Sequence, residues 1–248
     1  MLKKIIIIIT LVTLVNCSGT IDTSNLTPEK HLEYAMSLYN DGDYEEAVRE
    51  FQSIILQFAG NTVNDDAQYY LGMSYFKQEQ YLLAAYEFSK LIRDIPASKF
   101  VPDAQFMLAD SYYELSPPYP LDQKYTKKAI DEFQAYIDFF PTNVKVQDAE
   151  KKIKELNNKL AEKEFNAARI YKRMEYYNAA IKFYGRVADT YHDTKYAPLA
   201  LYNKINLLIY KKRNKEALRD IAEFLGRYPD NEKAEELKNQ LKQLAEAK

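Results

Sequence analysis

Cysteine is almost absent from this 248-residue chain, which has a single one, at position 17. One cysteine excludes a disulfide within the chain and any metal site built from clustered cysteines. Tryptophan is missing, and six glycines and nine prolines leave few tight turns. Twenty-two tyrosines and twelve phenylalanines are present instead. This balance predicts an all-α protein whose helices pack through aromatic side chains.

An excess of charge of one sign is also missing. Lysine and arginine number 34 against 36 aspartates and glutamates, which gives a formal net charge of −2 at pH 7. Nucleic acids and bare anionic membranes attract proteins that have a strong positive field. The sequence therefore predicts no nucleic-acid partner and no attachment to lipid by charge alone.

Residues that could build an active site are scarce. The two histidines, His31 and His192, have no cysteine or suitably spaced carboxylate near them, so neither indicates a metal site or a catalytic triad. A glycine-rich phosphate loop and the GxSxG and HExxH motifs do not occur. We predict that both histidines are surface or helix-end residues. We also predict that the chain is not an enzyme and has no catalytic residue, cofactor or metal.

The first sixteen residues have the pattern of a secretory signal. Lys3 and Lys4 precede an uncharged run from Ile5 to Val15. At about 1.5 Å per residue this run covers roughly half of a ~30 Å hydrocarbon core, which disfavours a transmembrane helix. We therefore expect residues 1–16 to be a cleaved signal peptide.

Cys17 directly follows that run. Leu14-Val15-Asn16-Cys17 resembles the bacterial lipobox, with Asn16 where glycine, alanine or serine is usual. The resemblance implies that Cys17 is modified with acyl chains. It also implies that Ser18, the next residue, permits export to the outer membrane. Several acyl chains anchor a protein firmly, and residues 17–27 read as a polar tether. The alternative is a chance cysteine near a cleavage site.

A repeat of about 37 residues fills the rest of the chain. Each copy has a small residue at one position and a large one four positions later, on the same face of a helix. The small residues are Ala47, Ala84, Ala129, Ala180 and Ala217, and the large ones are Phe51, Phe88, Phe133, Tyr184 and Ile221. The copies open near Pro28, Asp65, Pro102, Ala161 and Pro198. Three prolines, Pro96, Pro141 and Pro229, mark helix ends.

This pattern resembles the tetratricopeptide (TPR) repeat, most clearly in the second copy, where Leu71-Gly72, Tyr75 and Tyr81 are in register. We expect an all-α TPR superhelical solenoid of five helix-turn-helix repeats. Repeats one to three would occupy residues 28–141, and repeats four and five residues 142–248.

Two insertions separate the third repeat from the fourth. Residues 116–123, SPPYPLDQ, lengthen the turn inside repeat three, and their prolines favour a stiff extended loop. Residues from Val146 to about Met174 have no proline or glycine and apolar positions at helical spacing, which predicts one long helix that opens repeat four. After Pro229, Asn231 caps a predicted amphipathic helix to about Ala247 that would close the solenoid.

The segment from Leu160 to Arg173, LAEKEFNAARIYKR, is followed by an aromatic turn from Tyr176 to Ala180 and by Tyr191-His192. Together with the lipobox and five TPRs, it is similar to the fourth repeat of the BamD family of outer-membrane β-barrel assembly lipoproteins. The usual Tyr-Pro of that family is Tyr191-His192 here. The resemblance implies a lipid-anchored protein on the periplasmic side of the outer membrane. It also implies a BamA-like barrel-forming partner and unfolded outer-membrane proteins as clients.

Two inner surfaces follow from the repeat register. In TPR arrays the first helix of each repeat lines the concave side, where apolar residues and methionines that are not buried favour binding. The predicted client groove consists of Tyr39, Tyr69, Met73, Phe76, Phe106 and Tyr113. The predicted partner-binding residues are Arg169, Lys172 and Arg173. Each set also has a purely structural explanation. The predicted groove residues could pack against neighbouring repeats, and the three basic residues could be the solvated face of a long helix.

Other functions remain open from the sequence. A TPR lipoprotein could coordinate peptidoglycan synthesis or cell division in the envelope, although such relatives usually carry a coiled coil and this sequence shows none. It could also deliver peptides to a hydrolase encoded elsewhere. Copurification with a large β-barrel protein would separate the assembly hypothesis from both.

Overall fold

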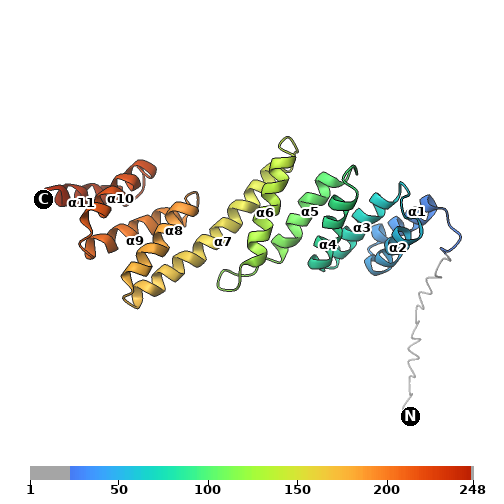
Figure 1. Cartoon of the computed structure of the whole chain (residues 1–248), viewed down its shortest axis with the longest axis horizontal. Coiled ribbons are helices and arrows are strands. Elements are labelled where there is room, and N and C mark those ends of the chain that lie inside the picture. The colour runs from blue at the N-terminus through green and yellow to red at the C-terminus, as the bar shows by residue number, and fades with distance from the viewer. Residues whose placement is uncertain (1–22, 247–248) are drawn as a thin grey trace, which may run out of the picture.

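The computed structural model describes residues 23–246, and within this range every regular element is an α-helix (Figure 1). The helices are α1 (Pro28–Asp41), α2 (Tyr44–Gln57), α3 (Asn64–Lys77), α4 (Tyr81–Asp94), α5 (Val101–Glu114), α6 (Lys124–Phe139), α7 (Val146–Arg173), α8 (Tyr177–Thr190), α9 (Tyr196–Tyr210), α10 (Asn214–Arg227) and α11 (Ala234–Glu246). Consecutive helices pack against one another along an elongated solenoid, so the predicted all-α TPR fold is confirmed. No helix of residues 23–246 is long and apolar enough to span a membrane.

The repeat register is confirmed by burial. All five alanines at the predicted helix crossings are fully buried, and so are the large residues one turn later, with Tyr184 only 1 % exposed. Gly72 shows how closely the helices approach, because a Cβ on it would lie 2.7 Å from the ring of Phe88. The prolines predicted to mark helix ends do so: α4, α6 and α10 each end two residues before one, at Asp94, Phe139 and Arg227.

The turns within repeats and the turns between repeats also have recurring features. In repeats one, two, four and five, one residue between the two helices takes the left-handed conformation: Gly42, Glu79, Glu175 and Lys212, with φ between 56° and 87°. Such a residue satisfies carbonyls that the helix end leaves unpaired. In the turns that lead to α3, α5, α7 and α11, the side chain of Asn61, Ser98, Asn143 or Asn231 accepts a hydrogen bond from the backbone N–H two residues later, at 3.0–3.1 Å.

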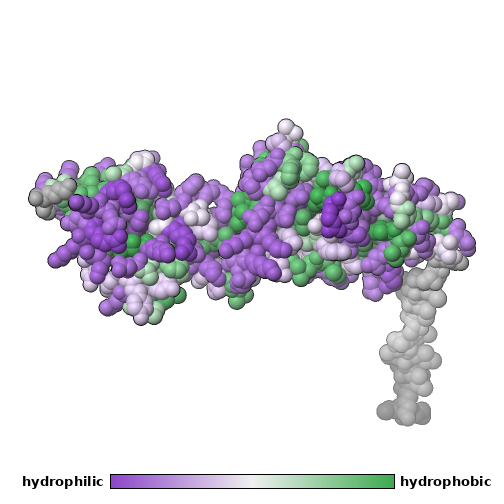
Figure 2. All heavy atoms as spheres, in the orientation of Figure 1, coloured by the Kyte–Doolittle hydropathy of each residue, from purple (hydrophilic) through white to green (hydrophobic). Residues whose placement is uncertain are grey.

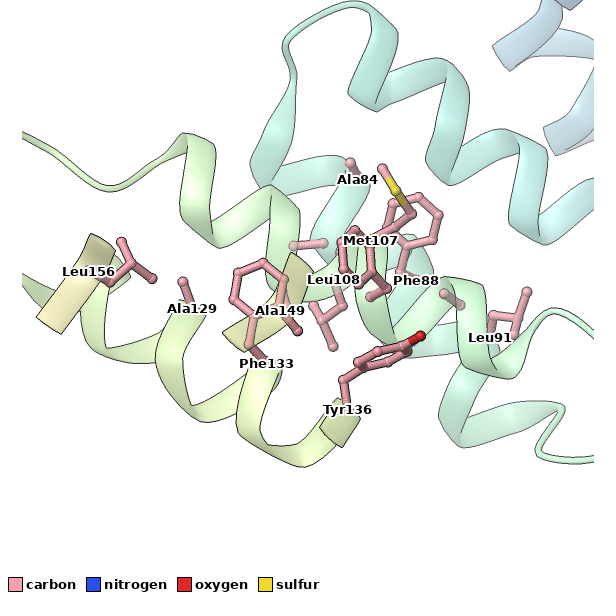
Figure 3. Close-up of a cluster of buried hydrophobic side chains, with 14 residues drawn as sticks. Ala84, Phe88, Leu91, Met107, Leu108, Ala129, Phe133, Tyr136, Ala149 and Leu156 are labelled. Carbon is pink, nitrogen blue, oxygen red and sulfur yellow. The ribbon is translucent and has the colours of Figure 1, made fainter. Parts of the chain in front are cut away.

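Helix α7 confirms the predicted helix from Val146 to about Met174. It has 28 residues, whereas α1, α3 and α5 have 14 each, so it is two first helices joined end to end. Ala149 and Leu156 belong to the core cluster that α4, α5 and α6 share with α7 (Figure 3). Ala161 and Ala168 belong instead to the core formed with α8, α9 and α10. The second half of α7 is therefore displaced by about 21 Å along the helix from the first.

Cross-helix ion pairs fix the first half of α7 to α5. Lys145 Nζ lies 2.8 Å from Asp103 Oδ1, and Lys152 forms an ion pair with Asp110 two turns further on. The predicted capping helix is α11, whose Leu237 is fully buried while Leu241 and Leu244 pack at the edge of the same cluster. The predicted signal peptide, residues 1–16, and Cys17 lie outside the described residues.

Candidate protein-binding surfaces

The residues predicted to line a client groove lie on α1, α3 and α5, but one of them is buried instead of exposed. Tyr39, Tyr69, Met73, Phe76 and Tyr113 are half-buried, whereas Phe106 is only 5 % exposed. Its ring lies 5.5 Å from that of Phe133 and 5.4 Å from that of Tyr136, and Lys145 of the following turn lies over it. The prediction that Phe106 faces an exposed groove is therefore wrong, because α6 and the start of α7 cover this part of α5.

Tyr69 joins neighbouring repeats. Its ring stacks on Phe100 with centroids 4.5 Å apart and planes at 9°. Burial raises the pKa of the Tyr69 hydroxyl, and the nearby carboxylate of Asp103 raises it further. The stacked face of this ring therefore packs between α3 and the turn before α5.

Tyr113 is tied to α7. Its hydroxyl donates a hydrogen bond of 2.7 Å to Glu155 Oε2, and the Lys152 ammonium lies 4.3 Å from its ring centroid. The hydrogen bond to Glu155, and secondly burial, raise the pKa of Tyr113 to about 12. Helix α7 thus covers a residue that the sequence placed on an open surface.

The other three residues of the predicted set, Tyr39, Met73 and Phe76, are partly open, and we call them the aromatic surface. Each is half-buried, with Tyr39 against Tyr70 at 5.3 Å and Phe76 against Tyr81 at 5.2 Å. In Figure 2 hydrophobic side chains are more frequent over α2 to α5, whereas the surface over α7 to α10 is mostly hydrophilic.

The predicted partner-binding residues have a different setting. Arg169, Lys172 and Arg173 are exposed near the end of α7 and line one cavity of about 850 Å³, which we call the α7 cavity. Its apolar lining comes from Phe165, Ile170 and Tyr184, and its other residues are Tyr119, Pro120, Lys163, Asn166, Ala167 and Asn203. The structure therefore brings all three predicted basic residues together around one concave site.

One wall of this cavity could not be predicted from the sequence. The proline-rich insertion folds back onto α7 and is held there by two lysines. Lys159 Nζ donates to Ser116 Oγ at 2.7 Å, and Lys163 Nζ donates to the Leu121 carbonyl at 2.6 Å. Burial lowers the pKa of Lys159. These contacts place Tyr119 and Pro120 beside the second half of α7, so the insertion is a docked loop rather than a free extended one.

The cations of the cavity are not neutralised by acidic side chains. Arg169 Nη1 donates to the amide oxygen of Asn166 at 3.2 Å. Between residues 23 and 246, no carboxylate lies within ion-pair distance of Arg169, Lys172 or Arg173. The nearby carboxylate of Glu164 is already paired with Arg186 at 2.9 Å.

His31 requires a second correction. It is fully buried and its Nε2 lies 2.6 Å from Glu50 Oε2, so the prediction of a surface or helix-end residue is wrong on exposure. The equivalent residues of repeats two and three are glutamines: Gln68 bonds Glu87 at 2.6 Å and Gln105 bonds Glu132 at 2.9 Å. His31 therefore takes part in a structural pair between the two helices of a repeat. In the described part of the chain, no group of three potential metal ligands comes together.

The solved structures that this chain is similar to include TPR proteins. The TPR2AB domain of yeast Sti1, in its complex with pHSP90, is 16 % identical with a TM-score of 0.44, over 84 % of this chain and 80 % of that one. A thermophilic TPR protein of Thermus thermophilus is 16 % identical with a TM-score of 0.37, over 88 % and 99 %. A TPR protein from Parabacteroides merdae is 14 % identical with a TM-score of 0.40, over 89 % and 87 %.

No curated protein matches the chain in sequence. A family model does: the family named YfiO, described as outer membrane lipoprotein, matches residues 25–214, from just before α1 to the first residue of α10. The match covers well over half of the chain and agrees with the BamD-type resemblance of the fourth repeat. The chain therefore belongs to the YfiO, or BamD-type, family of outer membrane lipoproteins.

Proposed function

We propose that this lipoprotein is a non-catalytic subunit of the outer-membrane β-barrel assembly complex. It would scaffold a BamA-like barrel-forming subunit and recognise unfolded outer-membrane proteins. The observation that carries the proposal is the family match over residues 25–214, which includes helices α1 to α9, the aromatic surface and the α7 cavity. That family gives the chain a general role in outer-membrane assembly.

The aromatic surface would receive clients. Tyrosine and phenylalanine rings supply contact area at a low entropic cost, and methionine adapts to varied partners. Outward-facing strands of outer-membrane barrels carry the apolar and aromatic side chains that suit such a surface. Ordering a flexible chain offsets much of the gain, so micromolar affinity is expected.

The second half of α7 would hold the assembly partner. Arg169, Lys172 and Arg173 are exposed, lack a carboxylate partner among residues 23–246, and point their charges around one cavity. Charge complementarity mainly sets the choice of partner and the association rate. An acidic patch on the periplasmic part of the barrel-forming subunit would fit this surface.

Lipidation of Cys17 and the tether of residues 17–27 would place the solenoid on the periplasmic side of the outer membrane. Two or more acyl chains on one cysteine suffice for stable anchoring. In this arrangement the solenoid can reach both the barrel subunit in the membrane and clients in the periplasm.

Copurification tests the proposal. The tagged full-length protein is purified from gently solubilised cell envelopes, and the proteins that accompany it are identified by mass spectrometry. We expect a large outer-membrane β-barrel protein in stoichiometric amount. Enzymes of peptidoglycan synthesis or division in its place would overturn the proposal in favour of the envelope-coordination alternative.

A further inference from the structure

The α7 cavity is built by parts of the chain that are far apart in sequence. Its floor is the second half of α7 with Tyr184 of α8, one side is Asn203 of α9, and the other side is Tyr119 and Pro120 of the docked loop. A volume of about 850 Å³ lies within the usual range for ligand sites and accommodates a few amino-acid residues.

Hydrogen bonds fix the loop at the residues that form the side of the cavity. Lys163 reaches from α7 to the carbonyls of Pro120 and Leu121, and Gln123 Nε2 donates to the carbonyls of Pro118 and Leu121 at 3.0 Å each. Two prolines before Tyr119 limit the loop's conformations further. A rigid aromatic ring beside an apolar floor loses little entropy when it binds a ligand.

The charges of the cavity point to an anionic ligand. Lys163 is already satisfied by loop carbonyls, whereas Arg169, Lys172 and Arg173 have no acidic partner within the described residues. A guanidinium binds a carboxylate with two parallel hydrogen bonds, and it binds more strongly where water is partly excluded. The lining is also apolar at Phe165 and Ile170, which disfavours a small hydrated ion.

We propose that the α7 cavity binds an acidic linear peptide segment of a protein partner. A carboxylate of the segment is held by Arg169 with Lys172 or Arg173, and an adjacent aromatic or aliphatic side chain lies between the Tyr119–Pro120 wall and Phe165. The carboxylate belongs to a side chain or to the chain end, since both have the same chemistry. The inference rests on the proposed function only in assigning this segment to the assembly partner.

Fluorescence anisotropy with labelled eight-residue peptides tests the inference on the purified protein. The first probe has a central phenylalanine flanked by aspartate and glutamate, and the second has asparagine and glutamine in their places. Both are made with an amidated and with a free C-terminus. We expect micromolar binding of the acidic probe that weakens with added salt. The neutral amidated probe should bind at least about tenfold more weakly.

Comparison of the amidated and free C-terminal forms of each probe identifies the source of the carboxylate. If the acidic amidated probe binds, side-chain carboxylates are sufficient. If binding instead requires the free C-terminus, the chain end supplies the carboxylate. Equal binding of all four peptides, or of none, overturns the inference.

Variants locate the binding site. Arg169→Gln with Arg173→Gln should weaken the acidic probe at least about tenfold, and Tyr119→Ala about three- to tenfold. Arg93→Gln on α4 and Lys242→Gln on α11, which change the same charge far from the cavity, should leave binding unchanged. Thermal unfolding of each variant shows that it is folded. Unchanged binding in the arginine double variant would contradict the assignment.

The inference and the proposed function can fail separately. If the acidic probe binds at the cavity while the arginine double variant still copurifies with the barrel protein, the cavity binds peptides but does not hold that partner. If copurification is lost while no probe binds the wild-type protein, the basic surface holds the partner and the peptide site is wrong.

Discussion

At the scale of single residues, this solenoid depends on a left-handed position between the helices of a repeat. The residue there is glycine in repeat one and Glu79, Glu175 or Lys212 in repeats two, four and five. Side chains other than glycine are strained in this conformation by roughly 1–2 kcal/mol. Repeat one therefore has the least strained of these turns.

Two glycines provide a matched test of that strain. Gly42 has a φ of 87°, Gly226 lies within α10, and no atom comes within 4 Å of a Cβ added to either. Gly42→Ala should lower the free energy of unfolding by about 1 kcal/mol through backbone strain alone. Gly226→Ala should raise it by up to about 1 kcal/mol, because alanine favours the helix. Urea unfolding measures both, and equal effects of the two substitutions would contradict the argument.

The hydrogen bond between Tyr113 and Glu155 predicts sensitivity to alkali. The pKa of Tyr113 is raised from 10.0 to about 12 in the folded protein, mainly by that bond. Below pH 10 the tyrosine is neutral in both states and its stabilisation is complete. Between pH 10 and 12 the unfolded chain loses this proton first, so the stabilisation disappears as the pH rises.

Tyr113→Phe removes the titrating hydroxyl and keeps the ring. The free energy of unfolding of the wild type should consequently fall more steeply between pH 10 and 12 than that of the variant. Urea midpoints at several pH values give this slope. Parallel slopes for the two proteins would show that the Tyr113 bond does not contribute.

At the scale of elements, the docked loop is the feature that separates this array from a regular repeat. Lys163→Met removes the donor to Pro120 and Leu121 while keeping the length of the side chain. A hydrogen bond contributes about 0.5–1.5 kcal/mol, so amide hydrogen exchange in residues 116–123 should accelerate up to roughly tenfold. Lys242→Met on α11 is the control. Unchanged exchange in the loop would mean that Lys159 and the prolines hold it without Lys163.

The helices were predictable from the sequence because their signals are local. A small residue such as Ala84, followed by Phe88 one turn later, fixes the crossing of two helices whatever surrounds them. The prolines and the proline-free run of α7 fixed the helix ends in the same way. Residues that are close in sequence supply all of this information.

The positions that could not be predicted depend on distant residues. Phe106 is buried because α6 and Lys145 cover it, and the loop is docked because Lys159 and Lys163 come from a helix more than 40 positions later. No periodicity within α5 or the loop carries that information. The basic residues Arg169, Lys172 and Arg173 were predictable as a group because helical spacing alone places them at one end of α7.

At the scale of the whole molecule, α7 connects two arrays of different surface character. Its first half completes the core of repeats one to three, and its second half opens repeat four. A continuous helix of 28 residues holds the two arrays in a fixed relation. The aromatic surface and the α7 cavity are thereby kept apart on one rigid support.

Anchoring is expected to depend on Cys17 alone. Cys17→Ser should leave a folded protein that no longer fractionates with outer membranes, because acyl chains supply the anchor. Membrane fractionation followed by immunoblotting decides this. A variant that stays in the outer-membrane fraction as firmly as the wild type would show that lipidation is not what holds it there.

The central claim is that clients and the assembly partner use different surfaces. Four tagged proteins test it together: the wild type, Met73→Ala with Phe76→Ala, Arg169→Gln with Arg173→Gln, and Leu82→Ala with Leu83→Ala as a control on exposed leucines of α4. Each is measured for binding of a strand peptide from an outer-membrane barrel and for copurification of the large barrel protein. Thermal unfolding confirms that each variant is folded.

We predict that the Met73 and Phe76 variant weakens peptide binding about tenfold or more, roughly 1.4 kcal/mol, and keeps the barrel protein. The arginine variant should keep the strand peptide and lose the barrel protein, and the control should resemble the wild type. Equal loss of both partners in both variants would contradict the division of labour between the two surfaces.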